Sequence, residues 1–335
     1  MQIARVWAAI GIGFLAVGMT ESRALAADFY QGRTLTVIVG YAPGGGVDTT
    51  ARAVTRHLGR FIPGNPAITV QNMEGAAGIV SVHHLVRRVA PDGLTLGIPG
   101  RSWFIEGIVG RQGVAFDPVT LTYIGSPGSV TSAAFIRTAT GIKTFEDLKA
   151  SKKPVSFGAL GAGTHTATVP NLLAANGIPI RVVLGYVSTA RILLALEQGE
   201  VDGSFTTGDG IANRAALAKQ VTPIVQSAPR FPGLPLLRDV IAERHRPLLD
   251  LVMATDTFGV PIVAPPGVPA EQTAILRKAF LAMALDPDYQ TDARRVELPV
   301  GSPIEGGKLT EMMRALAAAT TPQVIAEFQK LVSGK

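Results

Sequence analysis

Hydrophobic runs of strand length alternate with helical repeats of hydrophobic positions in the first third of the chain. Residues 34–39, 67–71 and 94–98 are rich in valine, isoleucine, leucine and threonine and lie between turn residues, so they predict strands. Residues 48–60 carry hydrophobic side chains at helical spacing, and a second helix is expected over residues 78–89. This alternation predicts a mostly parallel sheet covered by helices.

The same alternation returns after residue 130. It predicts three strands, at residues 155–158, 181–184 and 202–205, and two helices, at residues 166–176 and 189–198. Gly199 directly follows the second of these helices and suits its carboxyl end. The last part of the chain predicts a returning strand, a helix and a helical tail, at residues 258–264, 270–284 and 303–331.

Two α/β units, joined where the chain crosses near residues 125–130 and 255–260, predict an α/β fold with two lobes. Lobe I is expected to comprise residues 27–128 and 256–335, and lobe II residues 129–255. Ligands of such sheets bind beyond the carboxyl ends of the strands. We therefore expect one ligand cleft between the two lobes.

The N-terminus has the features of a cleaved export signal. Arg5 precedes an apolar run over residues 6–19, and Ala24-Leu25-Ala26 matches the small-residue pattern of a cleavage site. The run is 14 residues long, whereas a stable transmembrane helix needs about 20, so a membrane anchor is the alternative. We predict a signal peptide over residues 1–26, cleaved near Ala26, and export to the periplasm.

The composition limits the function further. The chain has no cysteine, which excludes a lipid-anchored cysteine and indicates that packing rather than disulfides provides stability. The formal net charge of +6 is spread along the chain, and the aromatic residues, 6% of the total, do not alternate with the basic ones. This pattern argues against nucleic-acid binding. It fits a positive field that attracts anions, and equally an ordinary solvated surface.

The segment after the first predicted strand has the composition of an anion-binding loop. Consecutive glycines permit positive φ and expose the backbone, and the next helix begins with unpaired N–H groups and a favourable dipole. An ordinary strand-to-helix turn is the alternative. Asp48 could cap the helix or accept a hydrogen bond from a ligand or a water. The candidate ligand-binding residues are Ala42, Pro43, Gly44, Gly45, Gly46 and Asp48.

Loops of the second unit repeat this arrangement. Residues 158–166 contain glycines spaced G-x-x-G-x-G, unlike the G-x-G-x-x-G of a dinucleotide site, so their amides and hydroxyls are expected to bind an anion instead. In residues 185–190, Ser188 or Thr189 could cap the next helix or face the ligand. Asp202 could orient a hinge strand, line the cleft or occupy an ordinary turn. The candidates are Gly161, Gly163, Thr164, His165, Thr166, Tyr186, Ser188 and Asp202.

Motifs of enzymes and metal sites are absent from the sequence. It contains no H-E-x-x-H, no G-x-S-x-G and no cysteine nucleophile. Its histidines, at positions 57, 83, 84, 165 and 245, show no metal-pair spacing. We therefore predict no catalytic residue, no metal and no cofactor.

A series of short motifs resembles the substrate-binding proteins of tripartite tricarboxylate transporters, the Bug family. The motifs follow one another along the chain behind the predicted signal peptide. They are residues 42–48 (APGGGVD), 71–78 (QNMEGAAG), 90–93 (APDG), 161–164 (GAGT), 200–203 (EVDG) and 263–269 (VAPPGVP).

The resemblance implies a type II periplasmic-binding-protein fold and capture of a mono-, di- or tricarboxylate. One carboxylate would be held by the loops at residues 42–48 and 161–166, partly through ordered waters. The resemblance also implies delivery to a membrane permease of one large and one small subunit. We expect the binding protein itself to be a monomer.

The sequence departs from the family's pattern near the expected ligand. Val47 stands where a hydroxyl is common, and Glu74 adds an acid to a loop that is commonly basic. His165 directly follows Thr164, whereas many members carry the histidine further on. These departures favour a small or singly charged carboxylate over citrate. A sensor that contacts a signalling kinase and an exported enzyme on the same two lobes are the alternative functions.

Overall fold

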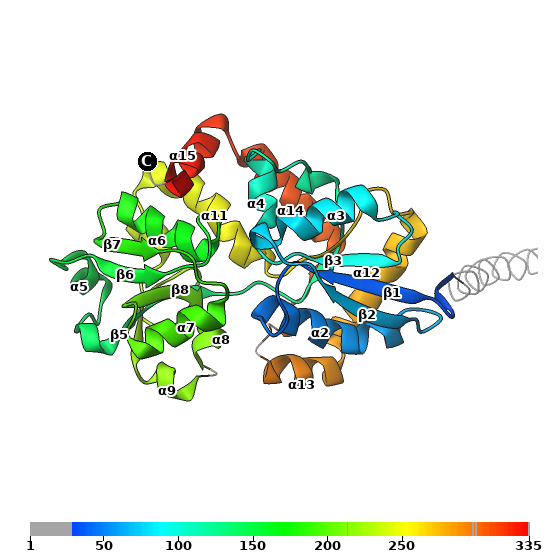
Figure 1. Cartoon of the computed structure of the whole chain (residues 1–335), viewed down its shortest axis with the longest axis horizontal. Coiled ribbons are helices and arrows are strands. Elements are labelled where there is room, and N and C mark those ends of the chain that lie inside the picture. The colour runs from blue at the N-terminus through cyan, green and yellow to red at the C-terminus, as the bar shows by residue number, and fades with distance from the viewer. Residues whose placement is uncertain (1–28, 213, 297, 299, 334–335) are drawn as a thin grey trace, which may run out of the picture.

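Two β-sheets organise the chain in the computed structural model, which describes residues 29–333 except 213, 297 and 299. The helices around each sheet complete one half of the molecule, and the two halves lie side by side (Figure 1). We call the half around the six-stranded sheet lobe I and the half around the five-stranded sheet lobe II. The predicted α/β fold is confirmed, and the residue limits of the lobes stay a prediction. The predicted signal peptide, residues 1–26, lies outside the described residues.

The sheet of lobe I has the strand order β11-β4-β10-β3-β1-β2. The first three strands along the chain, β1, β2 and β3, are parallel, as the alternation predicts. By contrast, β10 is antiparallel to β3 and β4, and β11 is antiparallel to β4. The strands are β1 (Thr34–Val39), β2 (Ala67–Asn72), β3 (Thr95–Ile98), β4 (Thr122–Ser126), β10 (Ile262–Ala264) and β11 (Ile304–Glu305).

The sheet of lobe II has the strand order β7-β6-β8-β5-β9. The three strands that the sequence predicts here, β6, β7 and β8, are parallel, and β5 is antiparallel to β8 and β9. The strands are β5 (Ser132–Arg137), β6 (Val155–Gly158), β7 (Ile180–Val183), β8 (Gly203–Thr207) and β9 (Val221–Gln226).

Helices cover both sheets, and among the described residues none combines the length and apolar composition that crossing a bilayer requires. In lobe I and its C-terminal extension they are α2 (Gly46–Leu58), α3 (Ile79–Arg88), α4 (Trp103–Ile108), α12 (Ala270–Leu285), α13 (Pro287–Arg295), α14 (Gly306–Ala319) and α15 (Pro322–Ser333). The others are α5 (Phe145–Lys149), α6 (His165–Ala175), α7 (Thr189–Gln198), α8 (Gly208–Ala212), α9 (Ala215–Ala218), α10 (Leu237–Val240) and α11 (Arg246–Phe258).

The returning strand is shorter than predicted. The sequence predicts extended chain from residue 258, but Phe258 is the last residue of α11, and only Ile262–Ala264 forms a strand. Gly259, with φ of 62° and ψ of −128°, ends the helix in a conformation that residues with a side chain rarely adopt. A helix therefore occupies the sequence before this crossing.

The central strand β1 is buried on both faces because helices cover both sides of its sheet. Val37 and Val39 pack in one hydrophobic cluster with Val54 of α2. Ile38 points to the opposite face and packs in the other cluster with Val82 of α3. This burial explains why the strand is a nearly continuous hydrophobic run rather than an alternating one.

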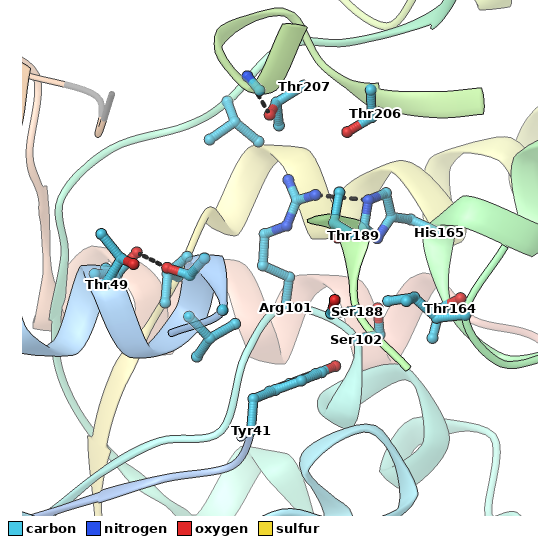
Figure 2. Close-up of a pocket in the computed structure, with 18 of the residues that line it drawn as sticks. Tyr41, Thr49, Arg101, Ser102, Thr164, His165, Ser188, Thr189, Thr206 and Thr207 are labelled. Carbon is cyan, nitrogen blue, oxygen red and sulfur yellow. Dashed lines mark hydrogen bonds between the residues drawn. The ribbon is translucent and has the colours of Figure 1, made fainter. Parts of the chain in front are cut away.

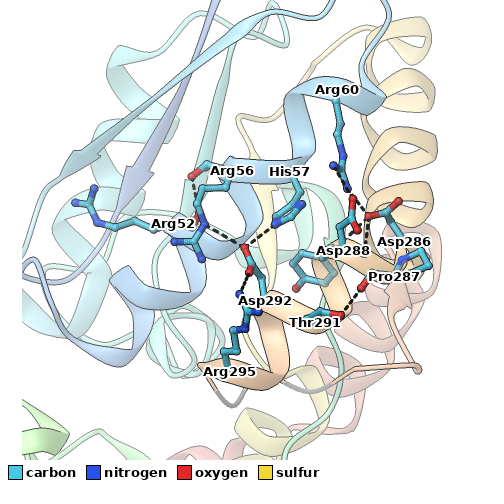
Figure 3. A network of polar contacts seen from close by, with 12 residues as sticks. Arg52, Arg56, His57, Arg60, Asp286, Pro287, Asp288, Thr291, Asp292 and Arg295 are labelled. Carbon is cyan, nitrogen blue, oxygen red and sulfur yellow. Dashed lines mark hydrogen bonds and ion pairs between the residues drawn. The ribbon is translucent and has the colours of Figure 1, made fainter.

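A polar network fastens α13 to α2 (Figure 3). The Nε2 atom of His57 lies 2.9 Å from Oδ2 of Asp292, and Nε of Arg56 lies 3.5 Å from the same oxygen. Arg60 pairs with Asp286, whose carboxylate also accepts from the first N–H groups of α13. The network therefore fixes the position of α13 relative to α2 and the turn that follows it.

The chain passes between the lobes three times within the described residues. The first two passages are residues 127–131, between β4 and β5, and residues 259–261, between α11 and β10. Val130 of the first passage is tied to α11, since its amide donates to the Asp256 carbonyl at 2.9 Å. The third passage follows α14, which packs on β4 of lobe I, and leads to α15, which packs on α6 and α11 (Figure 1).

Candidate functional site

A cavity of about 310 Å³ lies between the lobes, with walls from both. Lobe I contributes the start of α2 and the loop after β3. Lobe II contributes the starts of α6 and α7 and the end of β8 (Figure 2). The lining residues are Tyr41, Gly45, Gly46, Val47, Thr49, Thr50, Arg101, Ser102, Val130, Leu160, Thr164, His165, Ser188, Thr189, Thr206, Thr207, Gly210, Val260, Val296 and Leu298.

Helix starts from opposite lobes open onto this cavity. Gly45 precedes α2 and Thr164 precedes α6, and neither residue caps its helix with a side-chain hydrogen bond. The first-turn N–H groups of these two helices that make no bond within the helix are therefore available to an anion, which the helix dipoles also favour. In α6 the third of these groups, that of Ala167, already donates to the Thr164 carbonyl at 2.9 Å. The start of α7 differs, because the Ser188 hydroxyl accepts from the Arg191 amide at 3.3 Å.

Five of the sequence-predicted residues line the cavity: Gly45, Gly46, Thr164, His165 and Ser188. The first two come from lobe I and the other three from lobe II. The structure thus brings together residues from the three loops that the sequence singles out. The remaining predicted residues do not line the cavity.

Asp48 fixes the glycine turn from inside lobe I. Its carboxylate accepts from the Gly44 amide at 2.9 Å, from Arg52 Nε at 2.8 Å and from Asn72 Nδ2 at 2.8 Å. Burial alone would raise the pKa of Asp48, but these hydrogen bonds outweigh it and lower the pKa. The carboxylate thus holds the loop at Gly44 and makes no side-chain cap hydrogen bond to α2, and its role toward a ligand stays a prediction. Ala42, Pro43 and Gly44 are exposed and do not line the cavity.

Thr166 shapes its loop rather than the cavity surface. Its side chain is fully buried, and its hydroxyl accepts from the Leu160 amide at 3.1 Å and lies 2.8 Å from the Thr164 hydroxyl. Thr164 and Leu160 both line the cavity. Thr166 therefore positions two residues of the wall.

Tyr186 and Asp202 are engaged within lobe II. The Tyr186 hydroxyl donates to Glu200 Oε1 at 2.6 Å. Asp202 accepts from the amide and hydroxyl of Ser156, at 3.0 and 2.6 Å. Neither residue lines the cavity. The structure shows Asp202 hydrogen-bonded to Ser156 of β6, within lobe II.

Gly163 receives a side chain from the other lobe. A Cβ atom at this glycine would lie 1.9 Å from Oε1 of Glu106, a residue of α4. Glu106 is buried and accepts from Arg111 at 3.1 Å, and its Oε2 has no hydrogen-bond partner among the described residues. Burial raises the pKa of Glu106 by more than Arg111 lowers it. Gly163 therefore permits contact between the lobes, and neither Gly163 nor Gly161 lines the cavity.

Arg101 is the main residue that the sequence reasoning missed. It follows β3 and Gly100, whose φ of 103° leaves room for the Tyr41 ring. Its guanidinium extends across the cavity and donates to Nε2 of His165 at 2.6 Å and to Oδ1 of Asp256 at 3.3 Å (Figure 2). The only signal in the sequence was its place after a predicted strand, where ligands of such sheets bind.

The other lining residues outside the list of predicted ligand-binding residues are neutral. They supply hydroxyl groups, from Tyr41, Thr49, Thr50, Ser102, Thr189, Thr206 and Thr207, and apolar surface, from Val47, Val130, Leu160, Val260, Val296 and Leu298, beside the small Gly210. Among the described side chains that line the cavity, none is acidic and Arg101 alone is fully charged. The cavity thus suits an anionic group attached to a partly apolar body.

His165 is held as a neutral ring. Burial lowers its pKa well below the ordinary value, and the nearby charge of Arg101 lowers it further. A neutral imidazole is also what allows Nε2 to accept from Arg101.

Lowering the pH is expected to destabilise the protein through His165. Below about pH 6.5 the His165 side chain binds a proton in the unfolded chain but stays neutral in the folded protein. Each further pH unit downward therefore lowers the free energy of unfolding by up to about 1.4 kcal/mol. Urea unfolding at pH 7.5, 6.0 and 5.0 should show a flatter dependence for His165→Gln than for the wild type. The variant His245→Gln, at a site outside the cavity, is the control. Parallel curves for wild type and His165→Gln would contradict the expectation.

Comparisons with known proteins give relatives of low identity and clear structural neighbours. No family model matches the chain. A UPF0065 protein of Pseudomonas sp. (strain P51) is 26% identical over 276 residues, which cover 80% of each chain. The protein BugT of Bordetella pertussis is 35% identical over 96 residues, 29% of this chain and 28% of BugT.

Three solved structures share the fold. The periplasmic binding protein BugD has a TM-score of 0.67 at 18% identity, over 90% of this chain and 98% of BugD. MatC of Rhodopseudomonas palustris, solved with bound malate, has a TM-score of 0.66 at 20% identity, over 90% and 99% of the two chains. Another R. palustris protein, solved with adipate, has a TM-score of 0.67 at 18% identity, over 90% and 98%. The predicted fold, that of periplasmic binding proteins, is confirmed.

Proposed function

We propose that this chain, a homologue of the UPF0065/Bug proteins with the fold of a periplasmic binding protein, captures a small organic carboxylate as a solute-binding protein. The observation that carries the proposal is the pair of uncapped helix starts, α2 from lobe I and α6 from lobe II, at one cavity. Unpaired N–H groups at helix starts bind carboxylates well. Closure of the lobes on the ligand would bring both sets of donors to the same anion.

The bound ligands of the structural neighbours support the chemical class. Malate in MatC and adipate in the second R. palustris protein are both organic carboxylates. Because the lining of this cavity includes six apolar side chains, we expect the ligand to carry an apolar segment as well as a carboxylate. The hydroxyl groups of Thr206, Thr207 and Ser102 can donate to further oxygens of the ligand.

We also propose a periplasmic location and a transport role. Residues 1–26 have the pattern of a signal peptide, and BugD is a periplasmic binding protein. The ligand would pass to the large and small permease subunits of a tripartite tricarboxylate-type transporter. Lobe motion about the passages at residues 127–131 and 259–261 would open and close the site.

Carboxylates that bind the folded protein are expected to raise its melting temperature. A ligand present at 100 times its Kd adds about 2.7 kcal/mol to the free energy of unfolding, which corresponds to a rise of several degrees. Differential scanning fluorimetry against a panel of mono-, di- and tricarboxylates would measure this effect. The matched carboxamides serve as controls, because they retain shape and lose the charge. Shifts caused by neutral or cationic solutes, with none caused by any acid, would contradict the proposed function.

A further inference from the structure

The guanidinium of Arg101 has unused hydrogen-bonding capacity toward the cavity. Its side chain is only 14% exposed, so it must find partners inside the protein or in a ligand. A guanidinium has five N–H donors, and the bonds to His165 and Asp256 use one on Nη2 and one on Nη1. Donors therefore remain on a residue that extends across the cavity (Figure 2).

The positive charge of Arg101 is also poorly balanced. His165 is a neutral partner that accepts a hydrogen bond without supplying charge. Asp256 is anionic, but its oxygens also accept from the Ser132 amide at 2.9 Å, the Ser132 hydroxyl at 2.9 Å and the Ser227 hydroxyl at 2.7 Å. All three are shorter than its 3.3 Å contact with Arg101. Asp256 is thus hydrogen-bonded mainly to Ser132 and Ser227 and less closely to Arg101.

We propose that Arg101 is the specificity-determining residue of this site: it binds the ligand carboxylate directly and selects acids with a single negative charge. The inference rests on the proposed capture of carboxylates and names the group that discriminates among them. A ligand carboxylate would form charge-assisted hydrogen bonds of about 2.7–2.9 Å with the free donors of the guanidinium. The ligand would thereby supply the negative charge that balances Arg101, which neutral His165 does not provide and Asp256 provides only in part.

Selection for a single charge follows from the rest of the wall. Once one carboxylate has neutralised Arg101, a second would lie among hydroxyl groups and apolar side chains such as Val47, Val260 and Leu298. No second cation lines the cavity among the described side chains. Because an unpaired charge is costly to remove from water, the site should bind a monocarboxylate more tightly than the dicarboxylate of equal length.

Titration calorimetry on the full-length mature protein tests the proposal. The ligands are butanoate, hexanoate and benzoate, their amides, and the dicarboxylates succinate and adipate. The proteins are the wild type, Arg101→Gln, Arg101→Lys and the control Arg181→Gln, which changes an exposed arginine of β7. We expect Arg101→Gln to weaken binding of the acids by about 10- to 100-fold, Arg101→Lys by less, and Arg181→Gln not measurably. Binding of the amides should be the same in all four proteins.

The comparison of acid and amide on the wild type does not depend on any variant folding. A wild type that binds amide and acid equally, or a folded Arg101→Gln that binds the acids within twofold of the wild type, would overturn the role of Arg101 while leaving capture of carboxylates intact. Tighter binding of adipate than of hexanoate would overturn the selection for a single charge. A wild type that binds none of the acids would instead refute the proposed function itself. Unfolding curves recorded alongside identify a variant that fails to fold.

Discussion

Asp256→Asn is expected to lower the free energy of unfolding by about 3 kcal/mol or more, because it removes the anion from a buried ionic network. Asparagine has nearly the same shape, so no cavity forms. It has one oxygen and one NH₂ group, however, and the partners of Asp256 are the donors of Ser132, Ser227 and Arg101. One position would place donor against donor, and Arg101 would keep its charge with only a neutral histidine beside it.

Urea unfolding measures the loss, and the same helix offers a control. Asp250 also lies in α11, but it pairs with Arg238 on the surface, where both side chains are 57% exposed. Asp250→Asn should change the free energy of unfolding by less than about 1 kcal/mol. Combining Asp256→Asn with Arg101→Gln should recover at least about 1 kcal/mol, since the uncompensated charge is gone. An Asp256→Asn protein as stable as Asp250→Asn would show that the network contributes little.

Gly259→Ala is expected to cost about 3 kcal/mol or more. The conformation of this residue, φ of 62° and ψ of −128°, is unfavourable for any side chain. A Cβ atom there would also lie 2.0 Å from the carbonyl oxygen of Gly128, so the two crossing segments would have to separate. Binding of any ligand between the lobes should weaken as well, because both segments set the spacing of the cleft.

Gly233→Ala separates the two sources of this cost. Gly233 also has a positive φ, 78°, but no heavy atom lies within 4 Å of its would-be Cβ. Its substitution should cost only about 1 kcal/mol. Equal losses in urea unfolding for the two variants would mean that the contact between residues 128 and 259 adds nothing to the backbone effect.

The sequence predicts those parts of the fold whose signal is local. β1 and β2 and the helices that follow them appear as hydrophobic periodicity bounded by turns, and both are confirmed. Helix α11 was missed, because its residues, 246–258, precede a crossing and are buried on several sides, which obscures a helical repeat. The antiparallel strands β4, β5, β9 and β11 were missed as well, since their pairing depends on contacts far apart in the sequence.

The same distinction applies to the site. Glycine-rich helix starts are local patterns, and they place Gly45, Gly46, Thr164 and His165 in the cavity wall. The position of a long side chain is not local: Arg101 reaches residues 64 and 155 positions away in the sequence. Conversely, Gly163 fits a ligand loop by composition, yet its open face is occupied by a carboxylate from the other lobe. A glycine in sequence marks space near the backbone and does not identify what fills it.

The C-terminal helix adds a tether that two crossing segments alone would lack. Bodies joined only along neighbouring strands can rotate widely about that line. Here Val324 and Phe328 of α15 are buried where the helix packs on α6 and α11, after a connection that starts on the opposite half. Wide rotation would require this helix to slide or detach, so its 12 residues limit the amplitude of opening. If the lobes open and close on a solute as proposed, the rate of its escape would depend in part on this apolar packing, which is remote from the site.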